Sequence, residues 1–249
     1  MNEAVPTLAV HKFASCDGCQ LSLLGCESKV RQLSQLVRIA YFLEVERGSA
    51  PGPWDLSLVE GSISTGDDAA RIREIRENSK ALVAIGACAT AGGVQGLRNR
   101  SDGGFASLVY PEPDWIDHAP ESRPISDIVS VDYELWGCPV NPEQLLEVVS
   151  AVLDGRRPRI ETSSVCMECK RNGNVCVWVA SDTPCMGPVT RAGCGARCPA
   201  FDRGCYGCFG PQDTAKPEAW RSKLVELGYE PRDVERWTAS FNGPGFGKE

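Results

Sequence analysis

Apolar residues recur along the first two thirds of the chain in two alternating patterns. Short runs rich in valine, isoleucine and leucine alternate with longer stretches in which apolar residues recur every three or four positions. The short runs are typical of buried strands, and the longer stretches are typical of amphipathic helices. The expected strands are Thr7 to Phe13, Val37 to Leu43, Leu56 to Val59, Ala81 to Ile85 and Ile128 to Tyr133. The expected helices are Gln20 to Leu36, Asp67 to Asn78 and Pro142 to Leu153.

The order of these elements predicts an α/β fold with a flavodoxin-like parallel sheet in residues 1–155. After Asp154 the sequence reads Gly-Arg-Arg-Pro-Arg, and from Cys166 to Pro211 eight cysteines stand among glycines and prolines with little periodicity. We therefore expect residues 156–249 to form a second, small, loop-rich domain whose core is metal, closed by two terminal helices. The last seven residues are expected to have no fixed structure of their own.

Composition and charge narrow the classes of protein to which the chain can belong. It has 249 residues, 42% of them hydrophobic, and no apolar run approaches the roughly 20 residues that span a membrane. The start of the chain lacks the basic and apolar segments of a secretory signal, so we expect a cytoplasmic protein. The formal net charge of −7 argues against a chain-wide basic surface for nucleic acid.

Thirteen cysteines are the most informative feature of the composition. In a cytosolic chain of this size, reducing conditions favour metal or redox chemistry over disulfides. Four of them come shortly after apolar strand-like runs, namely Cys16, Cys19, Cys88 and Cys138. Because the carboxyl ends of parallel strands lie at one edge of a sheet, we expect these four thiols to meet there and to bind a 4Fe-4S cluster.

Eight further cysteines stand within 43 residues, with a Cys-x-x-Cys pair at each end of the block. They are Cys166, Cys169, Cys176, Cys185, Cys194, Cys198, Cys205 and Cys208. Eight thiolates make two four-ligand sites, which are either two more iron-sulfur clusters or a pair of zinc ribbons. The spacing Cys194-x-x-x-Cys198-Pro199 is similar to the end of a ferredoxin run and favours the clusters.

The remaining cysteine and the two histidines are not expected to bind metal. Cys26 continues the helical spacing of Leu23 and Leu33, so we interpret it as a thiol packed in the core. His11 lies in an expected strand and His118 in a proline-rich loop, where structural or exposed roles are expected. Catalytic acid–base pairs and phosphate-binding loops are not evident, which predicts a chain that moves electrons.

A series of ordered motifs resembles the small subunits of nickel-iron hydrogenases over nearly the whole chain. In the first part these motifs are Ser15-Cys16-Asp17-Gly18-Cys19, Val59-Glu60-Gly61-Ser62, the run from Gly86 to Gly93, and Gly137-Cys138-Pro139. In the second part they are the run from Pro184 to Cys194 and Cys205-Tyr206-Gly207-Cys208. Within this family the sequence is similar to the cytosolic group that serves soluble carriers, including the NADP-linked sulfhydrogenases.

The resemblance implies three 4Fe-4S clusters and divides the ligands among them. The proximal cluster, nearest the nickel-iron centre of a large subunit, would be bound by Cys16, Cys19, Cys88 and Cys138. The distal cluster would be bound by Cys166, Cys169, Cys176 and Cys185. The medial cluster would be bound by Cys194, Cys198, Cys205 and Cys208. Spacing alone would allow the last two groups to exchange members.

Four positions carry further expectations from the resemblance. Many membrane-linked relatives have histidine where Cys166 stands and proline where Cys198 stands, so this chain should complete all three clusters with thiolates. Glu60, at the end of the third expected strand, would lie near the interface with the large subunit and serve a proton or hydrogen-bond network. A helix cap or a surface carboxylate is the alternative for Glu60. Asp17 departs from the usual motif, and nothing in the sequence explains it.

The implied function is electron transfer between a nickel-iron large subunit, where hydrogen reacts, and a flavin- or iron-sulfur-containing reductase for a soluble carrier such as NAD(P). The chain itself would carry no catalytic residue. A hydrogen or redox sensor that signals through a partner is the alternative, and co-purifying proteins would separate the two. Respiratory quinone-reductase subunits share the first domain only, and the adjacent cysteines usual in them are absent here.

Overall fold

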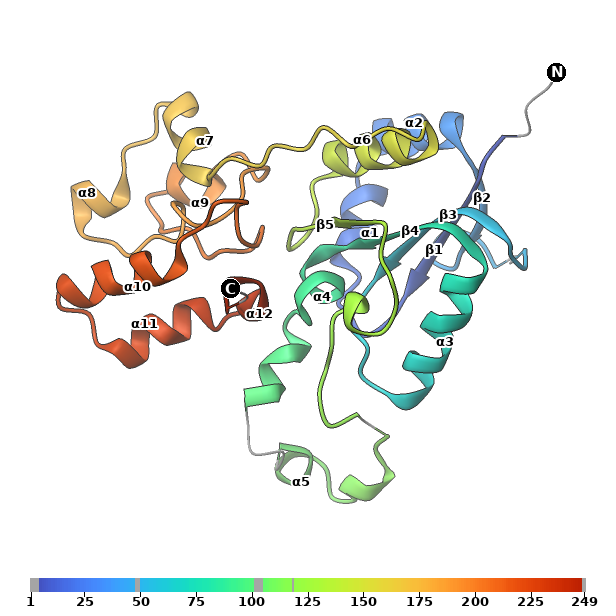
Figure 1. The fold of residues 1–249 in the computed structure, drawn as a ribbon, viewed down its shortest axis with the longest axis horizontal. Helices are drawn as coiled ribbons and strands as arrows, with labels where there is room; N and C mark the ends of the chain where they lie inside the picture. The colour runs from blue at the N-terminus through green and yellow to red at the C-terminus, as the bar shows by residue number, and fades with distance from the viewer. Residues whose placement is uncertain (1–4, 48–49, 101–104, 118, 248–249) are drawn as a thin grey trace.

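A five-stranded parallel sheet organises the first part of the chain. The computed structural model describes the chain except for residues 1–4, 48–49, 101–104, 118 and 248–249. The strands are β1 (Thr7–Lys12), β2 (Arg38–Phe42), β3 (Trp54–Glu60), β4 (Ser79–Ile85) and β5 (Tyr133–Leu135). Their order in the sheet is β2-β1-β3-β4-β5, the order of flavodoxin-like folds, so the expected fold class is confirmed (Figure 1).

Helices cover both faces of the sheet because successive side chains of a strand point to opposite sides. These helices are α1 (Gly18–Leu24), α2 (Glu27–Leu36), α3 (Gly66–Glu77) and α6 (Pro142–Leu153). Leu58 belongs to the core under α1, α2 and α6, whereas its neighbour Val59 belongs to the core under α3. Burial on both faces explains why the strands read as continuous apolar runs.

The expected helix from Gln20 to Leu36 is divided into α1 and α2. α1 ends at Leu24, Gly25 caps it, and Cys26 is the N-cap residue of α2. Because the helix is broken at Gly25, Cys26 is no longer on the same helical face as Leu23 and Leu33, and the apolar spacing does not predict its burial. Its thiol is half-exposed beside Ser28, and the interpretation of Cys26 as a packed core thiol is wrong.

The fifth strand lies later in the chain than the expected run from Ile128 to Tyr133. Residues Ile125–Asp127 form a 3-10 turn, η3, and the amide of Val129 donates to the carbonyl of Ile125 at 3.1 Å. Ile128 and Val129 pack against the core on the α3 side instead of joining the sheet. A short apolar run has the same pattern in a turn and in a strand, so periodicity could not place it.

Between β4 and β5 the chain extends away from the sheet, toward the bottom of Figure 1. This segment contains α4 (Gly86–Ala91), η1 (Gln95–Arg100), α5 (Phe105–Val109) and η2 (Pro113–Trp115). Leu108 and Trp115 are 87% and 85% exposed. Large apolar side chains therefore face solvent on this extension.

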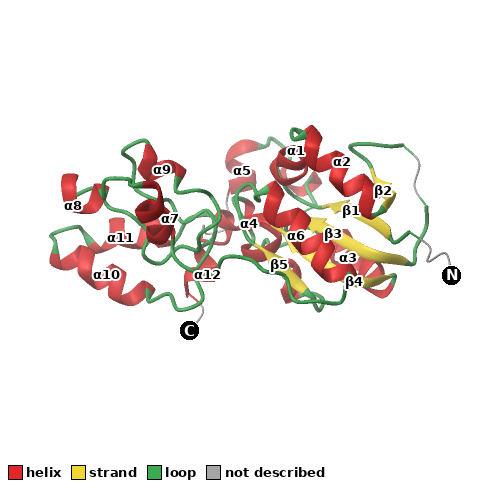
Figure 2. Cartoon of the chain, turned by 90° about the horizontal axis from the view of Figure 1, so that it is seen from above, coloured by secondary structure: helices red, strands yellow, loops and turns green. Residues whose placement is uncertain are grey.

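The rest of the chain forms a second packed region beside the sheet (Figures 1 and 2). Its helices are α7 (Val165–Asn172), α8 (Val177–Ser181), α9 (Arg197–Ala200), α10 (Pro217–Glu226), α11 (Pro231–Thr238) and α12 (Gly243–Gly247). The two expected terminal helices correspond to α10 and α11. Among the described residues, no helix has the length and apolar character needed to cross a membrane.

The end of the chain has more structure than the sequence suggests. α12 places Phe246 in the apolar core of the second region, where the residue is 2% exposed. The side-chain amide of Asn242 donates to the carbonyl of Gly207 at 2.9 Å. Tertiary contacts of one aromatic ring therefore order a segment whose glycines predicted no structure.

Candidate iron-sulfur centres

Four thiols lie at the carboxyl edge of the sheet, and we call them the proximal group (Cys16, Cys19, Cys88 and Cys138). Cys16 and Cys19 follow β1, Cys88 lies in α4 directly after β4, and Cys138 follows β5. Cys19 is buried and Cys88 is half-buried, whereas Cys16 and Cys138 are exposed. The proximal group is therefore open to solvent on one side.

The thiols of the proximal group are close enough for their charges to interact. Burial, and then the charges of Cys138 and Cys16, raise the pKa of Cys88 to about 11. Burial also raises the pKa of Cys19, with smaller contributions from Glu60, Cys88 and Cys138. Without metal, Cys19 and Cys88 are protonated at neutral pH, so a metal has to displace their protons in order to bind.

Glycine backbone lies directly against two of these thiols. Gly86 has a φ of 84° and Gly93 a φ of 62°, both in the left-handed region that favours glycine. A Cβ atom at Gly86 would collide with Sγ of Cys19, and one at Gly93 would lie 2.5 Å from Sγ of Cys88. Glycine at these two positions therefore lets the backbone pass directly against two of the four thiols. Four thiols are the ligand set of a 4Fe-4S cluster. The residues present therefore fit a 4Fe-4S cluster.

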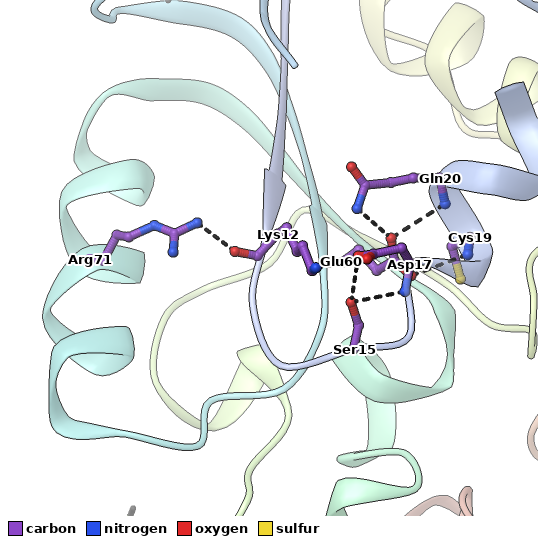
Figure 3. A network of polar contacts seen from close by, with 7 residues as sticks. All are labelled: Lys12, Ser15, Asp17, Cys19, Gln20, Glu60 and Arg71. Atoms are coloured by element: carbon purple, nitrogen blue, oxygen red, sulfur yellow. Dashed lines mark hydrogen bonds and ion pairs between the residues drawn. The ribbon is translucent and has the colours of Figure 1, made fainter. Parts of the chain in front are cut away.

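Glu60 lies beside Cys19 of the proximal group and holds the start of α1 (Figure 3). Its Oε1 accepts the amide N–H of Cys19 at 3.1 Å, and its Oε2 accepts the side-chain N–H of Gln20 at 2.7 Å. The backbone amide of Gln20 donates to the same Oε2 at 3.3 Å. Burial raises the pKa of Glu60, and these hydrogen bonds oppose the rise.

At 2% exposure, Glu60 is not a surface carboxylate. Its bonds to the first turn of α1 are those of a helix cap supplied from another element. Gln20 is a site residue that sequence reasoning missed, because a glutamine directly after Cys19 carries no periodic or motif signal.

Asp17 has a structural explanation that the sequence did not provide. It adopts the left-handed conformation, with a φ of 64°, between the first two cysteines. Aspartate tolerates this conformation better than most residues with a Cβ atom. Its Oδ2 accepts a hydrogen bond from Nζ of Lys12 at 2.7 Å, and its amide donates to Oγ of Ser15 at 3.4 Å (Figure 3). Asp17 therefore shapes the turn that presents Cys16 and Cys19.

A second set of thiols, the distal group, consists of Cys166, Cys169, Cys176 and Cys185. Burial, and then the charges of Cys185, Cys169 and Cys176, raise the pKa of Cys166 to about 11. A Cβ atom at Gly187 would lie 3.3 Å from Sγ of Cys185 and 3.4 Å from Sγ of Cys166. Glycine backbone thus borders this group as it borders the proximal group.

The third set, the medial group, consists of Cys194, Cys198, Cys205 and Cys208. Burial, and then the charges of Cys194, Cys138 and Cys198, raise the pKa of Cys208 to about 12. Burial is also the main cause that raises the pKa of Cys194, followed by the charge of Glu168. Cys208 therefore lies close to Cys194 and Cys198, whereas Cys205 interacts with Cys208 and also with Cys185 of the distal group. The division of the eight cysteines into two groups of four stays a prediction.

The medial group lies between the other two groups. On one side, Cys208 is close enough to Cys138 of the proximal group for their charges to interact. On the other side, the amide of Cys205 donates to Sγ of the distal Cys185 at 3.2 Å. A cavity of about 540 Å³ is lined by medial thiols together with Cys138 and Cys26. The three groups thus form a row that crosses from the sheet into the second region.

The thiols within a group are near one another without meeting at a single point. In the part of the chain that the structure describes, no three His, Cys, Asp or Glu side chains converge as the ligands of one metal ion do.

His11 lies away from the thiols, inside the sheet region. It is 3% exposed, its ring stacks on Tyr41 at 4.8 Å, and it meets Trp54 edge-on at 4.9 Å. This placement agrees with the structural role expected for it. His118 lies outside the described residues.

Comparisons with known proteins agree with this geometry. Residues 16–152 match the family described as NADH ubiquinone oxidoreductase, 20 Kd subunit. Sulfhydrogenase 2 subunit delta of Pyrococcus furiosus is 36% identical over 204 residues, which cover 82% of this chain and 86% of that protein. A subunit of the F420-non-reducing hydrogenase vhu of Methanocaldococcus jannaschii is 34% identical, with coverage of 83% and 84%.

Solved structures share the fold. A chain of an NAD+-reducing nickel-iron hydrogenase in the H2-reduced state has a TM-score of 0.57 and 26% identity, covering 63% of this chain and 95% of that chain. A chain of the reduced, active Ni-Fe-Se hydrogenase from Desulfomicrobium baculatum has a TM-score of 0.59 and 18% identity, covering 85% and 96%. At that level of identity the second likeness concerns the fold alone.

Proposed function

This chain belongs to the hydrogenase small subunits of the family described as NADH ubiquinone oxidoreductase, 20 Kd subunit, and from this premise we propose that it transfers electrons through three 4Fe-4S clusters. Its relatives are hydrogenase subunits, so the chain is part of an oxidoreductase complex. The observation that carries the proposal is the row of three thiol groups, linked by Cys138 with Cys208 and by Cys205 with Cys185.

Each group supplies four thiolates, the number that one 4Fe-4S cluster requires. When bound, the clusters supply one-electron carriers between a nickel-iron centre on a large subunit and a reductase for a soluble carrier. The chain's own residues hold the ligands in place: Glu60 and Gln20 fix the turn of Cys19, and backbone amides donate to Sγ of Cys185. Hydrogen bonds of this kind tune the potential of a cluster.

The large subunit is proposed to cover the proximal edge. Cys16 and Cys138 are exposed there, and a charged cluster at this edge would otherwise face water directly. Glu60 lies beside the same edge with its carboxylate buried, which suits the hydrogen-bond network implied by the resemblance. A proton role for Glu60 forms part of this proposal.

The reductase is proposed to contact the opposite end of the row, where Cys176 of the distal group is exposed. We propose a cytoplasmic complex in which the reductase module contains flavin or iron-sulfur groups and serves a soluble carrier, with NAD(P) as the first candidate. We also propose a domain division at residue 155, with the proximal cluster in residues 1–155 and the other two clusters in 156–249. Two separate apolar cores support this division.

Metal analysis of the anaerobically purified chain tests the clusters directly. We expect about twelve iron atoms and a matching amount of acid-labile sulfide per chain, since three sites of the cluster type hold four irons each. Zinc in place of iron in the second region would contradict the proposal there, and an iron content of about four would limit it to the proximal group.

Co-purification tests the partners. A nickel-containing large subunit and a flavoprotein or iron-sulfur reductase are expected to accompany the chain. A kinase or another signalling protein in place of the reductase would favour the sensor alternative. A stable monomer with loaded clusters and an open proximal edge would contradict the proposed assembly.

A further inference from the structure

Glu168 lies in α7 between two distal cysteines, yet its carboxylate contacts the loop of the medial group. Its Oε1 accepts the amide N–H of Gly193 at 2.9 Å and that of Gly195 at 3.1 Å. Its Oε2 accepts the amide N–H of Ala196 at 3.1 Å and lies 3.7 Å from Sγ of Cys194, which donates to it. One side chain of α7 thus contacts one medial ligand and the backbone on both sides of it.

These contacts leave a negative charge beside the medial group. Backbone amides are neutral donors, so they hold the carboxylate without cancelling its charge. Glu168 and Cys194 are both half-buried, where solvent screens a charge less than it does at the surface. Adding an electron to a cluster beside this carboxylate therefore becomes less favourable.

Two neutral side chains, one from the sheet region and one from α7, donate hydrogen bonds to the same medial loop. Nδ2 of Asn141, the cap of α6 in the sheet region, donates to the carbonyl of Gly193 at 2.8 Å. Nδ2 of Asn172, at the end of α7, donates to the carbonyl of Gly195 at 3.0 Å. Glu168 adds negatively charged contacts to the same loop. Mutations of the asparagines and of Glu168 can therefore separate the effect of loop position from the effect of local charge.

We propose that Glu168 is a positioning residue that joins the distal helix to the medial ligand loop and lowers the reduction potential of the medial cluster. The inference rests on the proposed function, because it requires a cluster at the medial group. The carboxylate of Glu168 lies 3.7 Å from Sγ of the medial Cys194 and accepts three backbone amides of the same loop, whereas its charge acts more weakly on the distal Cys169. The effect on the medial cluster should therefore exceed the effect on the others. The carboxylate would thereby set the distance between the distal and medial clusters. It would also set the difference between their reduction potentials.

The test is a redox titration of the intact complex, followed by the paramagnetic signals of the reduced clusters. In Glu168→Gln we expect the medial midpoint potential to rise by about 59 mV or more, which is a tenfold change in the equilibrium of a one-electron carrier. Proximal and distal potentials should shift less. Glu161→Gln removes a charge of the same sign whose hydrogen bonds go to Ser163 and Arg171 and not to the medial loop, and it should leave the medial potential unchanged.

Two further variants separate charge from position. Asn172→Ala removes a neutral tie to the loop, so amide hydrogen exchange at Gly195 and Ala196 should accelerate without a comparable change in potential. Glu168→Asp keeps the charge on a shorter side chain. If Glu168→Gln loses medial iron, Glu168→Asp should restore it.

A medial potential in Glu168→Gln equal to that in Glu161→Gln would overturn the inference. Loss of iron in Glu168→Gln that Glu168→Asp does not restore would overturn it as well. A wild-type complex without a medial cluster would refute the proposed function instead. In that case, amide exchange at Gly193, Gly195 and Ala196 would still report whether Glu168 holds the loop.

Discussion

The two regions of this molecule differ in how many of their thiols contact an apolar core. In the sheet region, strands and helices bury aliphatic side chains on both faces, and three of the four proximal thiols stand outside that core. In the second region, Cys185 and Cys205 are members of the apolar core, and Cys169 and Cys194 pack against it. The sheet region therefore presents most of its thiols at an edge, whereas the second region includes thiols in its apolar core.

Helix length sharpens this contrast. The helices beside the distal and medial groups have eight, five and four residues. Helices this short are not stable by themselves in water and depend on tertiary contacts. Ligand bonds to iron are therefore expected to supply much of the folding free energy of the second region, as structural metals do in other small domains.

Removal of iron should produce the largest difference between the regions. After anaerobic chelation, amides of α7 and of residues 185–208 should exchange at nearly unprotected rates, while amides of β3 and β4 stay protected. Hydrogen exchange with mass spectrometry measures both regions in one sample. Equal protection of both regions in the iron-free chain would show that the second region folds without its clusters.

Replacement of Cys198 by proline should affect only the medial group. Cys198 lies in the first turn of α9, where proline is tolerated, so the substitution removes a thiolate with little backbone change. We expect loss of about one iron atom and a 3Fe-4S paramagnetic signal in the oxidised protein. Removing a negative ligand should raise the potential of this centre and slow reduction of the soluble carrier.

Cys26→Ser is the matched control for this variant, because Cys26 lines the same cavity but belongs to none of the three groups. It should keep full iron content and the wild-type spectrum. If Cys198→Pro also keeps its iron and spectrum, the division of the eight cysteines is wrong.

Acid should weaken the sheet region through His11. Burial, and then the charge of Arg71, lower the pKa of His11 to about 3. Since the folded pKa lies below the unfolded value of about 6.5, stability is complete above pH 6.5 and is lost as the pH falls toward 3. At pH 5 the loss should be about 2 kcal/mol, from 1.36 kcal/mol per pKa unit.

His11→Phe should remove this pH dependence while keeping a flat ring between Tyr41 and Trp54. Urea unfolding of the sheet region at pH 7 and pH 5 measures the difference. The same loss of stability in wild type and variant between these pH values would assign the acid sensitivity to other groups.

Asp55 should have the smallest effect, and only on the sheet region. Lys80, and then the amide and hydroxyl of Thr7, lower the pKa of Asp55 to about 2. The folded pKa lies below the unfolded one, so this stability is present above about pH 4 and is lost toward pH 2. Because Asp55 lies near the surface, solvent screening reduces the expected cost of Asp55→Asn to about 1 kcal/mol at pH 7.

Lys80→Met tests the cause of this effect. It removes the exposed cation and leaves the two bonds from Thr7, so it should cost less than half as much as Asp55→Asn in the same urea unfolding measurement. An equal cost for both variants would mean that the ion pair, not the hydrogen bonds between β1 and β3, carries the contribution.

Local patterns were sufficient for much of the sheet region. The first four strands, α3 and α6 follow from apolar runs and from caps such as Asn141, whose side chain accepts the amide of Glu143. The sequence also placed Cys16, Cys88 and Cys138 at one edge, because all parallel strands end on the same side. It failed at Cys26 and at Ile128, where a glycine and a turn change the phase of an apolar run that looks continuous.

In the second region the sequence by itself determined that eight cysteines stand in a segment without periodicity and predicted that they are ligands, and the family resemblance predicted their grouping. Only the tertiary structure decided that the medial group lies between the other two. It also decided that Glu60, at the end of β3, caps α1, and that Glu168 in α7 contacts the loop of the medial group. The physical reason is that loops without periodicity are positioned by hydrogen bonds between residues distant in the chain, such as the 25 positions between Glu168 and Gly193. Such bonds leave no local pattern in the sequence.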